Sequence, residues 1–153
     1  MKTLHEFTCV FAVAVCVAGC SSSVEERLTT SEANPEVPVG IWATKDAVLK
    51  HEFLFEGAAV YLGADGVGAI VGGPPPIGMR IEGIFDADSS TFAYRMTEQG
   101  EVKGEGKLLY DPDKDTMVTE GQPETVMHRR FDELTDSVRK ELGLERTKKK
   151  ESP

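Results

Sequence analysis

The sequence lacks an apolar run long enough to cross a membrane. Its N-terminal run, Phe7 to Ala18, is almost wholly apolar for twelve residues, whereas a membrane-spanning helix needs about 20. The position of this run is typical of the apolar region of a secretory signal, and the small residues Ala18 and Gly19 fit a cleavage site. We therefore predict that residues 1–19 are a signal peptide.

Cysteine is also scarce: the chain has three, and Cys9 and Cys16 lie in the predicted signal. The third ends the stretch Val17-Ala18-Gly19-Cys20, which resembles the lipobox of bacterial lipoproteins. The resemblance implies cleavage before Cys20 and attachment of lipid to its thiol and its new amine. One acyl chain anchors a protein only marginally, whereas two or three hold it firmly. The alternative is an ordinary signal that is cut beside a cysteine by chance.

The residue after Cys20 bears on which membrane holds the anchor. Ser21 stands where lipoproteins retained in the inner membrane often resemble one another in carrying Asp. The resemblance therefore implies the bacterial outer membrane, on its periplasmic face rather than the cell surface. With Cys20 capped by lipid, the processed chain keeps no thiol for a disulfide, a cluster or a nucleophile.

Basic residues are outnumbered: 17 Lys and Arg stand against 26 Asp and Glu, a formal net charge of −9. Removal of the signal takes away Lys2 and Glu6, so this balance is unchanged. Contact with phosphates needs a basic patch, and the acidic surplus therefore argues against a nucleic-acid partner. It also argues against broad electrostatic attachment to anionic lipid.

Residues that carry catalysis or hold metals are few after the signal. The spacing of His51 and His128 matches no metal-ligand motif, so we interpret them as two independent strand histidines. The chain has no G-x-S-x-G motif, and no thiol once Cys20 is lipidated. We predict no metal site, no cofactor and no enzymatic activity.

One acidic cluster imitates the start of a calcium-binding loop. Asp111, Asp113 and Asp115 have the required spacing, but Thr116 and Gln122 stand where an EF-hand needs Gly and Glu. A turn closed by an aspartate side chain, with the neighbouring proline, accounts for these residues better. We therefore predict a turn at this point rather than a calcium site.

Changes of composition divide the chain into five segments. We predict a signal peptide at 1–19, the lipidated cysteine and a disordered tether at 20–38, a β-barrel domain at 39–131, a C-terminal helix at 132–144 and a disordered charged tail at 145–153. The tether is predicted from its Ser, Thr, Glu and Pro content. The helix is predicted from Leu134, Val138 and Leu142, which recur every four residues; their narrow apolar stripe favours packing on the outside of the barrel.

The middle segment alternates apolar and polar residues between turn signals, which is typical of half-buried antiparallel strands. About eight strands at hairpin spacing predict an all-β fold, a meandering barrel or sandwich, and a barrel removes the exposed edges. On the face predicted to point inward we place a set of apolar residues and glycines, with a predicted role in ligand binding: Phe53, Phe55, Met79, Ile81, Phe85, Phe92, Tyr94, Met96, Gly104 and Gly106.

The first predicted strand opens with Gly40-Ile41-Trp42, which resembles the G-x-W start of lipocalins and of their small bacterial relatives. The resemblance implies a small up-and-down barrel in which Trp42 plugs one end. It also implies that an arginine of the last strand, predicted at 125–131, lies across the tryptophan. Arg129 shares a face with Met127 and matches best, and Arg130 is the out-of-phase alternative.

The interior of such a barrel admits two interpretations. A small barrel is just wide enough to be filled, or to hold one small ligand, and inward glycines either turn corners or leave space. In the second case the loop Gly72-Gly73-Pro74-Pro75-Pro76 would lie at the mouth. The sequence thus predicts a lipid-anchored binding module for a small apolar ligand; the alternative is an envelope protein that acts by binding another protein, as an inhibitor or assembly factor.

Overall fold

A computed structural model describes residues 37–145 of the chain. The predicted signal peptide, Cys20 and nearly all of the predicted tether and charged tail lie outside these described residues.

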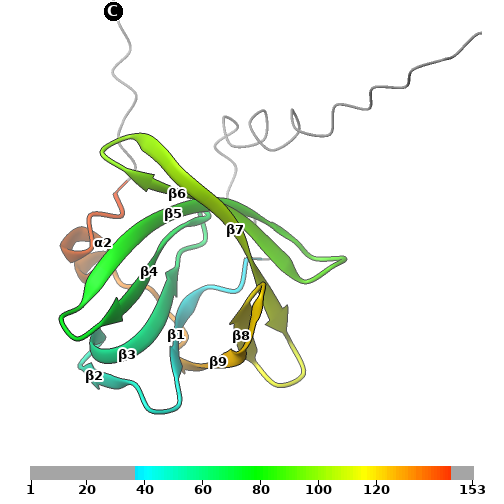
Figure 1. Cartoon of the computed structure of the whole chain (residues 1–153), viewed down its shortest axis with the longest axis horizontal. Coiled ribbons are helices and arrows are strands. Elements are labelled where there is room, and N and C mark those ends of the chain that lie inside the picture. Colours follow the sequence, from blue (N-terminus) through cyan, green and yellow to red (C-terminus); the bar gives the residue numbers. More distant parts are fainter. Residues whose placement is uncertain (1–36, 146–153) are drawn as a thin grey trace, which may run out of the picture.

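The described chain consists of nine strands followed by one short helix (Figure 1). In chain order they are β1 (Gly40–Thr44), β2 (Val48–Lys50), β3 (Phe53–Leu62), β4 (Val67–Gly73), β5 (Ile77–Asp86), β6 (Thr91–Glu98), β7 (Glu101–Asp111), β8 (Thr116–Thr119), β9 (Gln122–Phe131) and α2 (Asp136–Glu141).

Eight of the strands close into an antiparallel barrel. Each strand from β3 to β9 pairs with the next, and β1 closes the circle by pairing with both β9 and β3. The remaining strand, β2, extends beyond the circle and pairs with the first half of β3. The predicted all-β antiparallel barrel with a C-terminal helix is therefore confirmed, with one extra short strand.

Alternation along the strands sends apolar residues to both faces of the barrel wall, which produces two separate clusters. The interior cluster consists of Val37, Trp42, Val60, Leu62, Ile81, Phe85, Phe92, Tyr94, Leu108, Met117 and Met127. The outer cluster consists of Ile41, Ala43, Leu54, Ala59, Tyr61, Val67, Ala69, Val71, Val138 and Leu144. Val37, at the end of the predicted tether, thus belongs to the interior of the barrel.

Strand β3 bends sharply at Gly57, which has a φ of 98°. The backbone N–H of Leu54 donates to the hydroxyl of Tyr61 at 2.9 Å. An unbent strand would hold these residues about 23 Å apart, so the first half of β3 must fold back. The alternation of Leu49, His51, Phe53 and Phe55 with polar residues predicts one continuous strand here, whereas the chain turns at His51, which has a φ of 57°. The β2–β3 hairpin therefore covers the outer face instead of extending the barrel.

Helix α2 packs on the outside of the barrel, as its apolar stripe predicted. Val138 is fully buried in the outer cluster, and Leu134 and Leu142 pack against it. The helix is shorter than the range 132–144 predicted from sequence, because it begins after Thr135, whose side chain accepts from the backbone N–H of Val138 and caps the N-terminus. The apolar spacing extends beyond the residues that are helical.

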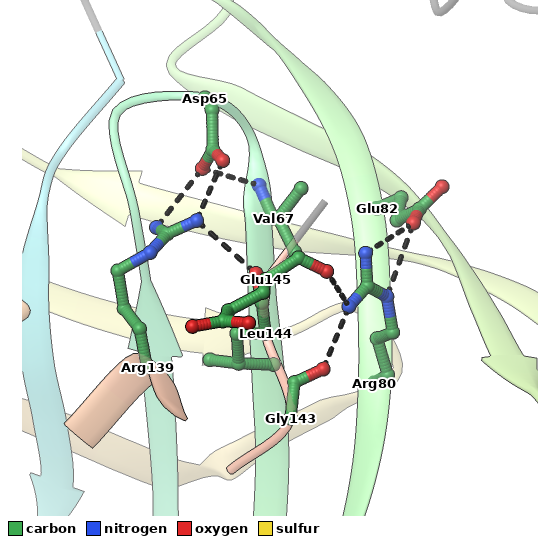
Figure 2. A network of polar contacts seen from close by, with 8 residues as sticks. All are labelled: Asp65, Val67, Arg80, Glu82, Arg139, Gly143, Leu144 and Glu145. Carbon is green, nitrogen blue, oxygen red and sulfur yellow. Dashed lines mark hydrogen bonds and ion pairs between the residues drawn. The ribbon is translucent and has the colours of Figure 1, made fainter. Parts of the chain in front are cut away.

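Polar contacts fix the end of the helix to the barrel (Figure 2). The guanidinium of Arg139 makes two bonds to the carboxylate of Asp65, at 3.1 and 2.6 Å, and a third to the carbonyl of Leu144. On the neighbouring strand β5, Arg80 donates to the carbonyls of Gly143 and Glu145. Because a bidentate guanidinium pair has a fixed geometry, these contacts set the position of the helix as well as holding it.

Candidate functional site

One end of the barrel is closed around Trp42. This residue is fully buried in β1, and the register pairs it with Arg129 of β9. The guanidinium carbon of Arg129 lies 4.3 Å from the centre of the Trp42 ring. Tyr110 meets the same ring edge-on, with centroids 6.3 Å apart. The out-of-phase Arg130 instead donates to the carbonyls of Thr44 and Lys45 at the surface.

The charge of Arg129 is neutralised within this closed end. Its Nε donates to the carboxylate of Asp115 at 2.6 Å, and another nitrogen donates to the carbonyl of Val39. Tyr110 donates its hydroxyl to the second oxygen of Asp115 at 2.9 Å. The hydrogen bond from Arg129 holds the pKa of Asp115 below its usual value. The groups around Trp42 therefore satisfy one another, and we interpret this end as a structural plug.

Aromatic residues of the predicted ligand face line the middle of the barrel. The rings of Phe92 and Tyr94 stack with centroids 6.4 Å apart. A Cβ atom built on Gly106 would lie 2.5 Å from the hydroxyl of Tyr94, and one built on Gly104 would lie 2.7 Å from Cε of Met96. Neighbouring side chains thus occupy the space above both glycines. Ile81 and Phe85 complete this layer in the same interior cluster.

The opposite end of the barrel exposes apolar side chains that face inward. Met79 and Ile77 share a face of β5 with the fully buried Ile81 by strand alternation, yet they are 38% and 73% exposed. Ile70, which is paired with Met79, packs against the interior cluster. Side chains on an inward face reach solvent only where the barrel is open. This end is therefore the mouth, which we define by Ile70, Ile77, Met79, Met96 and Gly104.

Two of the predicted ligand residues lie elsewhere. Phe53 packs against the outer cluster, and Phe55 is exposed with the ammonium of Lys50 3.8 Å from its ring centre. The bend at Gly57 separates both from the barrel interior, because it carries the first half of β3 over the outer face. The structure does not bring them together with the other predicted residues.

Two clefts lie at the barrel wall. A cleft of about 440 Å³ runs between β3, β4 and α2, and Pro76 of the predicted mouth loop forms part of its wall. A more polar cleft of about 530 Å³ lies between the β1–β2 loop and β9, and His128 lines it together with Asp46 and Glu124. Phe53 is the one residue predicted to bind a ligand that lines the first cleft, and none of the predicted ligand residues lines the second.

The candidate metal ligands stay apart. His51 lies in the β2–β3 turn and His128 on β9. Asp111 accepts from the backbone N–H groups of Asp113 and Lys114, which is the side-chain-closed turn predicted from sequence, while Asp115 points to Arg129. Within residues 37–145, no three His, Cys, Asp or Glu side chains are grouped as a metal ion requires. Over the same span, no helix is long and apolar enough to cross a membrane.

Sequence reasoning missed residues at both ends of the barrel. At the mouth, Ile70 and Ile77 face inward. The inward positions on either side of Ile70 are Gly68 and Gly72, so no alternation of apolar and polar side chains marks this strand in the sequence. At the closed end, Tyr110 and Asp115 complete the contacts of Arg129. Nothing in the local pattern distinguishes Asp115 from the other aspartates of its turn.

Comparison with known proteins identified no relative of this chain. No protein-family model matches the chain, and neither the curated proteins nor the solved structures contain a match.

Proposed function

We propose that this chain is a non-enzymatic binding module that holds a small apolar molecule in the open half of its barrel. The observation that carries the proposal is the exposure of Met79, an inward-facing apolar residue, at the mouth. Barrel mouths are frequent ligand sites because they are concave, apolar and preformed. Methionine suits such a site, since its flexible and polarisable side chain adapts to irregular shapes.

The proposal includes a lipid anchor at Cys20 and a place at the periplasmic face of the outer membrane. Its support is the lipobox-like stretch directly behind the apolar run, with Ser21 after the cysteine. An anchored module of this kind would act beside a membrane, where apolar molecules concentrate. The proposed relationship to lipocalins rests on Gly40-Ile41-Trp42 and on the contact between Trp42 and Arg129.

A matched pair of surface variants tests the ligand site. Met79 and Leu109 are equally exposed, at 38% and 39%, but Leu109 is next to the buried Leu108 on β7 and faces outward. Titration with a fluorescent apolar probe should show weaker binding in Met79→Gln and unchanged binding in Leu109→Gln. Native mass spectrometry of the purified protein should also detect a bound apolar molecule. If the wild type binds no apolar probe and carries no such molecule, the proposal is overturned.

A second candidate function, binding to another protein, rests on a separate observation. Ile77 and Val102 are strongly exposed, at 73% and 52%, and each lies within the first two residues of its strand, at the mouth end. An exposed apolar rim also suits a protein partner in the envelope. If Ile77→Asp abolishes capture of a defined envelope protein while probe binding is unchanged, the protein-binding function is favoured over the ligand-binding one.

A further inference from the structure

The hydroxyl of Tyr94 is a polar group inside the apolar barrel. Tyr94 is 6% exposed, stacks on Phe92 and crosses the inner face over Gly106. Among the residues that the structure describes, its hydroxyl has no hydrogen-bond partner. The chain's other two tyrosines differ: Tyr61 bonds to Leu54 and Glu52, and Tyr110 donates to Asp115.

This phenol has no partner in the described protein, and its hydroxyl is not among the fully buried side-chain atoms that lack one, so a molecule in the barrel can reach it. Burial raises the pKa of Tyr94, so its hydroxyl stays protonated and can donate. The same interior cluster contains a second donor, Nε1 of Trp42, which is fully buried at the closed end and has no partner. Of the two donors, the Tyr94 hydroxyl lies outside the closed end, and a molecule entering from the mouth can supply its acceptor.

The charges of the barrel favour a neutral acceptor over an anion. On β5, β6 and β7 the charged residues Glu82, Arg95 and Glu105 are paired in register, on the face opposite Ile81, Tyr94 and Gly106. At the closed end of the interior, the cation Arg129 is already bound by Asp115. A carboxylate in the barrel would therefore be desolvated without a counter-charge, which is strongly unfavourable.

We propose that the barrel takes a neutral amphiphile, an acyl chain that ends in an alcohol or ester oxygen, and that this oxygen accepts a hydrogen bond from the hydroxyl of Tyr94. The polar end enters first, and the acyl chain passes Met96 and Met79 toward the mouth. This inference rests on the proposed function, since it names the class of ligand for the same site.

Competition among probes of equal chain length tests the inference. The full chain carrying Cys20→Ser is used, so that no detergent is needed. The assay measures the concentration at which dodecanol, methyl dodecanoate, dodecanoate or dodecane displaces a fluorescent apolar probe. The alcohol and the ester should displace it at roughly three- to tenfold lower concentration than dodecane, as one hydrogen bond implies, and dodecanoate should be weaker than both. Tyr94→Phe should remove this preference, whereas the control Tyr61→Phe should keep it.

Each other outcome overturns a defined part of the argument. Equal displacement by dodecanol and dodecane, unchanged in Tyr94→Phe, overturns the role of Tyr94 and leaves the proposed function standing. Tightest binding of dodecanoate overturns the preference for a neutral ligand, and a wild type that binds no probe overturns the proposed function as well. A second measurement needs no variant: in wild-type protein labelled at tyrosine Cζ, dodecanol should shift the Tyr94 carbon signal and dodecane should not. An unshifted signal with bound dodecanol contradicts the inference.

Discussion

Arg129 lies across Trp42, with its guanidinium carbon 4.3 Å from the ring centre, and joins the first strand of the barrel to the last. The two residues face each other in the register of β1 and β9, where the circle of strands closes. Asp115, from the turn before β8, binds the same guanidinium from a third element. The arrangement therefore ties together three segments that are distant in sequence, at the end of the barrel opposite the mouth.

We expect Arg129→Ala to lower the free energy of unfolding by about 2 kcal/mol or more, because it removes a desolvated cation–π contact and leaves Asp115 without its partner. Arg130→Ala is the matched control, since its side chain binds two exposed carbonyls, and it should cost less than about 1 kcal/mol. Urea unfolding followed by Trp42 fluorescence measures both. Equal effects of the two variants would contradict the role assigned to Arg129.

The ion pair of Asp115 predicts a loss of stability in acid. Arg129 holds the pKa of this carboxyl below its ordinary value of 3.8, so the stabilisation is fully present above that pH. It is lost as pH falls through the lower folded-state pKa. The Asp115 side chain is 42% exposed, so solvent screening limits the effect to about 1 kcal/mol. Asp115→Asn should destabilise the protein at pH 7 and match the wild type at the lowest pH, by urea unfolding at each pH. A loss of unfolding free energy in Asp115→Asn that is independent of pH would count against the ion pair. Asp113→Asn is the control.

The two inward glycines of β7 should differ in their tolerance of a methyl group. At Gly104 the new Cβ meets only the flexible end of Met96, whereas at Gly106 it meets the ring and hydroxyl of Tyr94. We expect Gly106→Ala to cost about 1–3 kcal/mol and Gly104→Ala less than about 1 kcal/mol, by thermal unfolding.

The control for this comparison is Gly72→Ala. Its new Cβ would come no closer than 4.0 Å to the nearest atom, the carbonyl oxygen of Gly57, so stability should change little. A cost at Gly104 as large as that at Gly106 would mean that Met96 is held rigidly, which would argue against an adaptable mouth.

Cys20→Ser should release the protein from membranes, because the variant cannot accept the acyl chains that hold it there. Metabolic labelling with palmitate, followed by fractionation, measures both anchoring and processing. Cys16→Ser is the control, since it lies in the predicted signal and should leave label and membrane association unchanged. A wild-type chain that takes up no palmitate would end the lipoprotein hypothesis.

The local sequence was sufficient for the class of fold. Strand alternation is a local property, so the apolar and polar faces of β5, β6 and β7 could be assigned without knowing the partners of these strands. The C-terminal helix was predicted in the same way, from the spacing of Leu134, Val138 and Leu142. Its ends were predicted less well. The helix begins after the capping residue Thr135, whereas the apolar spacing continues into residues that are not helical.

Only the tertiary structure decided which end of the barrel is open and which polar groups lack partners. The bend at Gly57 removes Phe53 and Phe55 from the interior, although their alternation is as regular as that of Phe92 and Tyr94. The pairing of β1 with β3 and β9 closes the circle over Trp42 and leaves Met79 exposed at the other end. These outcomes depend on contacts between residues far apart in the chain, which a local pattern does not contain.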